Sequence, residues 1–195
     1  MTEASISSIR TKTAARPVPQ PPQTGGVHMR HPTAEDGSAI WTLARDSGKL
    51  DLNSPYAYLM MGHFFPQTCI IAEKDDEPVG SVIGFAPPAR PNALFVWQVA
   101  VSETVRGQGL ASRMIEHLLW TAPLDGQARW LEASVTPSNE PSARLFKGIA
   151  RRHGVSCEIA PLFEEDAFPP PHEAQASFEP EHLFRIGPLR QAKAA

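Results

Sequence analysis

Apolar side chains recur along this chain with two spacings, and these spacings predict its central elements. The run from Leu94 to Val101 is almost continuously apolar and rich in Val and aromatic residues, which is typical of a buried strand. After a glycine-rich turn, Leu110, Met114 and Leu118 follow at intervals of four, which predicts one apolar face of a helix. We expect the rest of the fold to be organised around this strand, turn and helix.

The remaining apolar patterns predict an alternation of strands and helices. Strands are expected at 27–31, 68–73, 78–86, 94–101, 128–136, 155–160 and 182–187. Thr33 and Ser54 are typical N-cap residues, so helices should run from Thr33 to about Gly48 and from Pro55 to about Phe65. Another helix should open at 137–140, and residues 74–77 should turn a hairpin. Because three strands follow one another in the middle, the sheet cannot be purely parallel.

Composition divides the chain into one domain and two tails. Residues 1–26 mix Ser, Thr, Pro and Gln, which predicts a disordered N-terminal tail, and 190–195 are expected to form a C-terminal tail. The domain is expected at 27–189. The first helix should bury Ile40, Trp41, Leu43 and Ala44, and the last should bury Ala143, Leu145, Phe146, Ile149 and Ala150. Prolines mark loops, above all a long acidic loop at 161–178.

Charge and cysteine content narrow the function classes. The net charge of −3 gives no basic footprint for nucleic acid, and no apolar run approaches the length of a membrane helix. Cys69 and Cys157 lie in separate apolar segments, which favours plain buried thiols in a reducing cytoplasm. The seven histidines show no ligand spacing, so no metal is expected.

The turn between the central strand and helix predicts an anion site. Glycines let the backbone approach a ligand, and the first N–H groups of a helix have no partner inside it. A P-loop is excluded because no Gly-Lys-Ser/Thr sequence follows. A dinucleotide fingerprint is weak, since Ser112 replaces the third glycine and the turn follows the fourth strand, although Glu132 could be the later acidic residue. Arg106, Gly109 and Ala111 fit a third pattern, Arg/Gln-x-x-Gly-x-Gly/Ala.

This third pattern resembles motif A of the GNAT N-acetyltransferases, which binds the pyrophosphate of acetyl-CoA. Four segments, SGKLDLNSPYAY at 47–58, LFVWQVAV at 94–101, LEASVTPSN at 131–139 and EHLFRIGP at 181–188, resemble more specifically the L-2,4-diaminobutyrate acetyltransferases of ectoine synthesis. The resemblance implies an α/β fold with a mixed, mostly antiparallel sheet of six to seven strands, splayed between strands four and five and flanked by about four helices. It also implies a cytoplasmic homodimer that acetylates the 4-amino group of L-2,4-diaminobutyrate for a compatible solute against osmotic stress.

The expected chemistry needs a base, because an alkyl ammonium with a pKa of about 10.4 cannot attack a thioester. Glu181 and Asp51 are the candidates in the family-like segments, and we expect Glu181 to be the base and Asp51 to anchor the substrate's second ammonium. Neutral donors are expected to meet the substrate carboxylate, namely Asn53, Tyr56, Trp97, Ser134 and Thr136. Turn chemistry for Asp51 and Asn53, and a core position for Trp97, remain alternatives.

Acetyl-CoA is expected along the central strand and turn. Backbone N–H groups would hold its pyrophosphate, those of Arg106, Gly107, Gln108, Gly109, Leu110 and Ala111. Val99, Ala100 and Val101 would pair with the pantetheine as a strand edge does, with an N–H near Val99 polarising the thioester. Asn139 and Arg144 match the second cofactor region, although Arg144 also fits an exposed helix face.

The chain departs from the family pattern at two positions. Relatives usually carry a histidine where Phe178 stands, and His172 or His182 could replace it. Many GNAT enzymes place a proton-donating tyrosine where Phe146 stands. A GNAT enzyme for another amine and an acyl-CoA-binding regulator without turnover therefore remain alternatives.

Overall fold

The computed structural model describes residues 26–48, 50–126, 128–169 and 178–190. The predicted N-terminal tail lies outside the described residues except for Gly26. The predicted C-terminal tail also lies outside them, except that Arg190 is the last residue of a strand.

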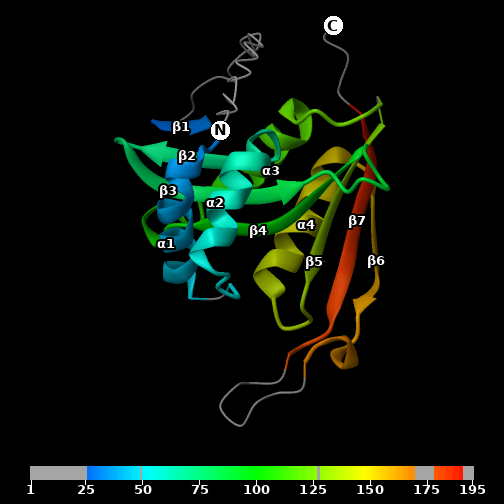
Figure 1. Ribbon diagram of the computed structural model, residues 1–195. Helices are drawn as coiled ribbons and strands as arrows, with labels where there is room; N and C mark the ends of the chain where they lie inside the picture. Colours follow the sequence, from blue (N-terminus) through cyan, green and yellow to red (C-terminus); the bar gives the residue numbers. More distant parts are fainter. Residues whose placement is uncertain (1–25, 49, 127, 170–177, 191–195) are drawn as a thin grey trace, which may run out of the picture.

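Seven strands form one sheet in the described part of the chain (Figure 1). They are β1 (Val27–Arg30), β2 (Ile70–Lys74), β3 (Glu77–Phe85), β4 (Ala93–Val101), β5 (Ala128–Val135), β6 (Ser156–Phe163) and β7 (Glu181–Arg190). The sheet order is β1-β2-β3-β4-β5-β7-β6, and every pairing is antiparallel except that of β4 with β5. The predicted mixed, mostly antiparallel sheet is confirmed.

Among the described residues four α-helices flank this sheet, in agreement with the predicted number of about four. They are α1 (Gly37–Ser47), α2 (Pro55–Phe64), α3 (Leu110–Thr121) and α4 (Glu140–His153). α1 and α2 pack on one face over Ile71 and Ile83, and α3 and α4 pack on the other over a larger core that includes Leu94, Leu131 and Ile186. In Figure 1 the helices α1 and α2 lie in front of β3 and β4, whereas β7 and β6 are seen without a helix before them.

Several element boundaries differ from the sequence prediction. β6 extends through Phe163, so Pro161–Phe163 belong to a strand and not to the predicted loop. The first helix opens with a 3₁₀ turn at Ala34–Asp36, in which Asp36 accepts from the backbone N–H of Thr33 at 2.7 Å. Ser54 precedes α2 but makes no side-chain cap. Trp41 and Leu43 are only half-buried, while Ile40 and Ala44 are buried as expected.

The predicted hairpin between β2 and β3 is confirmed, and its turn has an unusual backbone. Asp75 and Asp76 both have positive φ, at 53° and 64°. Two consecutive left-handed residues match the right-handed twist of a two-residue hairpin, and aspartate tolerates this conformation better than most side chains.

β4 and β5 are joined over only part of their length. Four residue pairs connect them, from Ala93 opposite Trp130 to Val96 opposite Ala133. Beyond Val96 the strands diverge, which confirms the predicted splay. The divergence begins at a β-bulge, because Val96 lies opposite Gly84 and Gln98 opposite Ile83, which leaves Trp97 without a partner on β3.

The contact between α2 and the first 3₁₀ turn generates a stability prediction. A Cβ at Gly62 would collide with the carbonyl oxygen of Thr33, which is backbone and cannot rotate away. We therefore expect Gly62→Ala to lower the free energy of unfolding by about 1–3 kcal/mol in urea titrations. Gly148→Ala is the matched control, since a Cβ at that helical glycine would meet only the ends of the Arg152 and Arg151 side chains, at 3.7 and 4.0 Å. The control should be neutral or stabilising by up to about 1 kcal/mol, and equal losses in both variants would contradict the collision.

Candidate active site

The turn after β4 is shaped for a ligand. Gly107 and Gly109 have φ of 78° and 72°, where a side chain would be strained. A Cβ at either position would meet nothing within 4 Å, so the space before the turn is open. α3 begins at Leu110, and its first-turn N–H groups precede the first intrahelical bond, from Arg113 to Gly109. The predicted anion cradle therefore has both of its parts, an open turn and a helix N-terminus.

Side chains around the turn leave its backbone as the binding element. Arg106 folds back, with Nε donating to the carbonyl of Val101 at 3.1 Å and Nη1 to Glu103 at 2.8 Å. Leu110 is buried in the core under α3, so only its backbone N–H can serve a ligand. Gln108 is exposed, and Ala111 is half-buried. These positions fit a group held by backbone N–H donors and the helix dipole.

The edge of β4 that faces β5 beyond Val96 has no partner among the described strands. Val99, Ala100 and Val101 lie on this stretch, paired on their other side with β3. The carbonyl of Val101 already accepts a hydrogen bond from Arg106. The rest of this β4 edge is one on which an extended ligand that contains amides can pair.

The second predicted cofactor region lies at the start of α4. Asn139 caps this helix, since its Oδ1 accepts from the N–H of Ser142 at 3.1 Å. Arg144 lies on the exposed face and pairs with Glu140 at 2.8 Å. Its cofactor role stays a prediction, and the observed pairing is that of an exposed helix face.

A carboxylate cluster lies at the start of β7. Burial raises the pKa of Glu181 above its usual range, and the charges of Asp51 and Glu179 raise it further. A hydrogen bond from Ser134 on β5 opposes this rise, as does the charge of His182. The Oε2 atom of Glu181 is buried and has no hydrogen-bond partner in the described part of the protein. A half-buried carboxylate with a raised pKa and a free oxygen suits proton abstraction.

The loop before α2 brings the predicted substrate residues to the same region. Gln98, next to the bulge residue Trp97, donates from Nε2 to the backbone carbonyl of Asp51 at 2.8 Å. This bond places Asp51 beside β4, and its charge is felt at Glu181. Trp97 is 37% exposed, so the alternative of a core position in the central strand is wrong.

Three other predicted substrate residues follow Asp51 and Ser134 closely along the chain. Asn53 is half-buried just before α2, and Tyr56 is exposed in the first turn of that helix. Thr136 is half-buried directly after β5, two residues beyond Ser134. Their contacts with a substrate stay predictions.

Sequence reasoning gave no role to Gln98 and Tyr58, although both stand in the family-like segments. The Tyr58 hydroxyl donates to Oε1 of Gln98 at 3.0 Å, and both side chains are buried. A glutamine inside an otherwise apolar strand was the available signal, because buried amides require specific partners.

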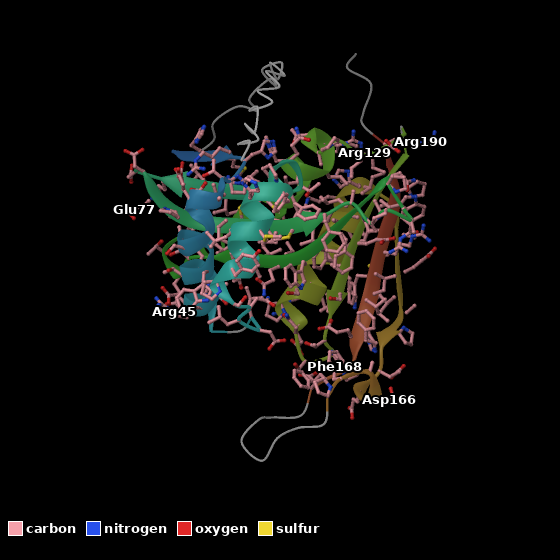
Figure 2. All side chains as sticks on the ribbon, in the orientation of Figure 1. Arg45, Glu77, Arg129, Asp166, Phe168 and Arg190 are labelled. Carbon is pink, nitrogen blue, oxygen red and sulfur yellow. The ribbon has the colours of Figure 1, made fainter. Side chains whose placement is uncertain are left out.

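The departures from the family pattern have structural counterparts. Phe178 stacks on Phe168 with ring centroids 5.1 Å apart, and Figure 2 shows Phe168 at the opposite end of the β5–β7 pair from Arg129 and Arg190. His172 lies outside the described residues, while His182 acts on Glu181 through its charge. Phe146 is buried in the core near Phe184, where it has no proton to donate.

Glu132 does not serve as a free ribose-binding carboxylate. It is fully buried, and Arg90 donates to it through Nε and Nη2 at 2.8–3.1 Å. Arg185 approaches it at 3.3 Å and stacks over the Trp130 ring at 4.1 Å. Because these arginines already occupy the carboxylate, the dinucleotide interpretation loses its acidic residue.

Two further properties of the described residues concern membrane-spanning helices and metal-binding groups. These residues contain no helix that is long and apolar enough to cross a membrane. In the same residues, no group of three or more His, Cys, Asp or Glu side chains could hold a metal ion.

The strand, open turn and helix agree with a known family. The model of the acetyltransferase (GNAT) family matches residues 37–149. The chain therefore belongs to the GNAT acetyltransferases.

Comparison with named relatives narrows the class of GNAT acetyltransferase to which the chain belongs. The L-2,4-diaminobutyric acid acetyltransferase of Halalkalibacterium halodurans is 41% identical, with 87% of each chain covered. That of Shouchella clausii is 43% identical, with 86% of this chain and 90% of the relative covered. A diaminobutyrate acetyltransferase from Paenibacillus lautus, solved with its substrate L-2,4-diaminobutyric acid and coenzyme A, has a TM-score of 0.77 at 40% identity and covers 86% of this chain and 98% of that one. Within the GNAT family, the chain belongs with the L-2,4-diaminobutyric acid acetyltransferases.

The carboxylate cluster generates a titration prediction. The Ser134 hydrogen bond favours ionised Glu181 and the Asp51 charge disfavours it. Ser134→Ala should therefore raise the pKa of Glu181, and Asp51→Asn should lower it. Carbon-13 NMR titration of the Glu181 carboxyl measures both shifts. Glu165→Gln, at an exposed turn position, is the control and should leave this pKa unchanged. An unshifted pKa in both site variants would show that the three groups do not share one site.

Proposed function

We propose that the protein transfers the acetyl group of acetyl-CoA to the 4-amino group of L-2,4-diaminobutyrate, giving N4-acetyl-L-2,4-diaminobutyrate in ectoine biosynthesis. The observation that carries this proposal is the cluster of Glu181, Ser134 and Asp51 beside the splay of β4 and β5. The identity of 40% or more to relatives that bear this activity in their names supports the choice of substrate.

Glu181 acts as the base in this proposal. The substrate amine is protonated at neutral pH and must lose a proton before it can attack. The raised pKa of Glu181 brings its proton affinity closer to that needed at neutral pH, and its unpartnered Oε2 can accept the proton directly or through a water. The deprotonated nitrogen then attacks the acetyl carbon, the C–N bond forms, and the C–S bond breaks to release the coenzyme A thiolate. The new amide nitrogen loses its second proton to that thiolate or to water.

Asp51 and the neutral donors orient the rest of the substrate. The exposed carboxylate of Asp51 pairs with the 2-ammonium, which leaves the 4-amino group for Glu181. The substrate carboxylate meets groups that carry no negative charge, those of Asn53, Tyr56, Trp97, Ser134 and Thr136.

The chain's own backbone holds acetyl-CoA. The N–H groups of residues 106–111 bind the pyrophosphate, and the free edge of β4 at 99–101 pairs with the pantetheine amides. A backbone N–H near Val99 polarises the thioester carbonyl. Since Phe146 is apolar, the thiolate leaves without a proton from that position.

The family resemblance also supports a cytoplasmic homodimer. β6 forms an edge of the sheet and exposes Ile159 and Phe163, which a second copy would cover. Sedimentation equilibrium should give twice the chain mass of 21.3 kDa. A single-chain mass at micromolar concentration would overturn the dimer but not the activity.

Coenzyme A release, read with a thiol reagent, tests the proposed activity. We expect turnover with L-2,4-diaminobutyrate to exceed that with ornithine, lysine and spermidine, because Asp51 and Glu181 must contact two ammonium groups at a fixed separation. Turnover of a different amine would replace the substrate but keep the acetyl transfer. Binding of acetyl-CoA without turnover of any of the four amines would favour a regulator.

Glu181→Gln supplies the site control for this assay. It should lower kcat by about 10²–10⁴-fold, since the amide cannot accept the proton, while acetyl-CoA binding is retained. Glu165→Gln removes an exposed carboxylate from the turn after β6 and should leave turnover unchanged. Full activity of Glu181→Gln would exclude Glu181 as the base.

A further inference from the structure

A buried amide links the substrate loop to the central strand. Gln98 is 8% exposed and Tyr58 is 1% exposed. Nε2 of Gln98 donates to the backbone carbonyl of Asp51 at 2.8 Å, and Oε1 accepts from the Tyr58 hydroxyl at 3.0 Å. Both ends of the amide are therefore engaged, one with the loop before α2 and one with α2 itself.

The orientation of this amide is determined by its partners. The Asp51 carbonyl can only accept, so Nε2 must face it, whereas the Tyr58 hydroxyl can donate to the remaining Oε1. A flipped amide would bring two oxygens together at Asp51. The Asp51 carbonyl therefore selects the orientation of the amide, and the Tyr58 hydroxyl satisfies its remaining oxygen.

The bulge at Trp97 is what turns Gln98 toward the loop. Gln98 lies opposite Ile83, which packs under α1 and α2, while Val99 lies opposite Val82 in the core under α3 and α4. Without the extra residue, alternation along β4 would direct Gln98 into the core under α3 and α4. The bulge at which β4 and β5 begin to separate thus also directs the Gln98 amide toward the substrate loop.

Packing alone does not require this pair. A buried amide and phenol lose their hydrogen bonds to water, and the bonds that they make inside the protein only compensate for this loss. An apolar pair of side chains would fill the same volume. The bond reaches the backbone of Asp51, so it leaves the Asp51 carboxylate available to a substrate. Its specific effect is to hold the position of Asp51 relative to Trp97 and Glu181.

We propose that Gln98 and Tyr58 are positioning residues that hold the Asp51 loop in its substrate-binding place and thereby set the affinity for diaminobutyrate. This inference rests on the proposed function. Gln98 acts through its bond to Asp51, and Tyr58 acts through Gln98.

Steady-state kinetics of the full chain test the proposal. Gln98→Leu should raise KM for diaminobutyrate about tenfold or more and leave KM for acetyl-CoA within about twofold, because the turn at 106–109 and the edge of β4 remain. Tyr58→Phe should raise KM for diaminobutyrate about two- to fivefold, since Nε2 still reaches Asp51. The double variant should be no worse than Gln98→Leu, because the two residues act in series.

Thr68→Val is the matched control. Thr68 is also buried, and its hydroxyl donates to the carbonyls of Gly84 at 2.8 Å and Phe65 at 3.1 Å, between the end of α2 and β3. It should lose stability as the Gln98 variant does, with both KM values unchanged. Parallel increases of both KM values in folded Gln98→Leu, or a fully additive double variant, would overturn the positioning role.

Hydrogen exchange separates this inference from the proposed function. Amides of residues 50–54 should exchange about tenfold faster in Gln98→Leu than in the parent protein, while those of β4 at 94–96 stay protected. Unchanged exchange in the loop would overturn the inference even if diaminobutyrate is acetylated. Faster exchange in a protein that does not acetylate diaminobutyrate would overturn the proposed function and the effect on affinity, but keep the link to the loop. If Gln98→Leu does not fold, Tyr58→Phe decides by the same measurements.

Discussion

The structure depends on the incomplete pairing of β4 with β5. Four residue pairs hold the two strands together, and then the strands separate. Backbone groups that leave a sheet ladder need other partners, and β4 continues without β5 beyond Val96 to its end at Val101, shortly before the glycine turn. The interruption that weakens the sheet thus leaves the strand edge on which the proposed amide-containing ligand would pair. The helix N-terminus of α3 follows directly after the same turn.

The parallel pairing of β4 and β5 brings distant segments to one site. A parallel connection requires a crossover, and α3 provides it directly after the turn. β7 then inserts between β5 and β6, so that Glu181 arrives beside Ser134 from the far end of the chain. The loop before α2 reaches the same place from the other face through Gln98. Three separate parts of the sequence converge because the sheet diverges between them.

Much of the fold was predictable, because buried strands and helices require apolar residues at regular spacings along the sequence. The strand at 94–101 and the helix after Gly109 both follow from apolar spacing, and the type of every strand and α-helix was predicted correctly. Pro161–Phe163 was missed because β6 is an exposed edge strand, where apolar residues need not alternate with polar ones. The raised pKa of Glu181 was not readable from the sequence, since it arises from burial and from the charges of Asp51 and Glu179, against the opposing hydrogen bond from Ser134. The burial and the contacts with Asp51 and Ser134 depend on elements far apart in the sequence. The family-like segments supplied the candidate site residues, but only the register of β4 explains why a glutamine follows Trp97.

The site disfavours ionised Glu181 until a cation joins it. Burial raises the proton affinity of Glu181 most, the charges of Asp51 and Glu179 raise it further, and Ser134 and His182 offset the combined rise only in part. A substrate with two ammonium groups would supply the missing positive charge, so its arrival would favour ionised Glu181 at the moment when a base is required. Asp51 is exposed to water, whereas Oε2 of Glu181 is buried without a partner among the described residues, and this difference supports the proposed division, with anchoring by the first and proton transfer by the second. Rigid placement of Asp51 then matters as much as its charge, because the Coulomb interaction with both substrate and base falls with distance.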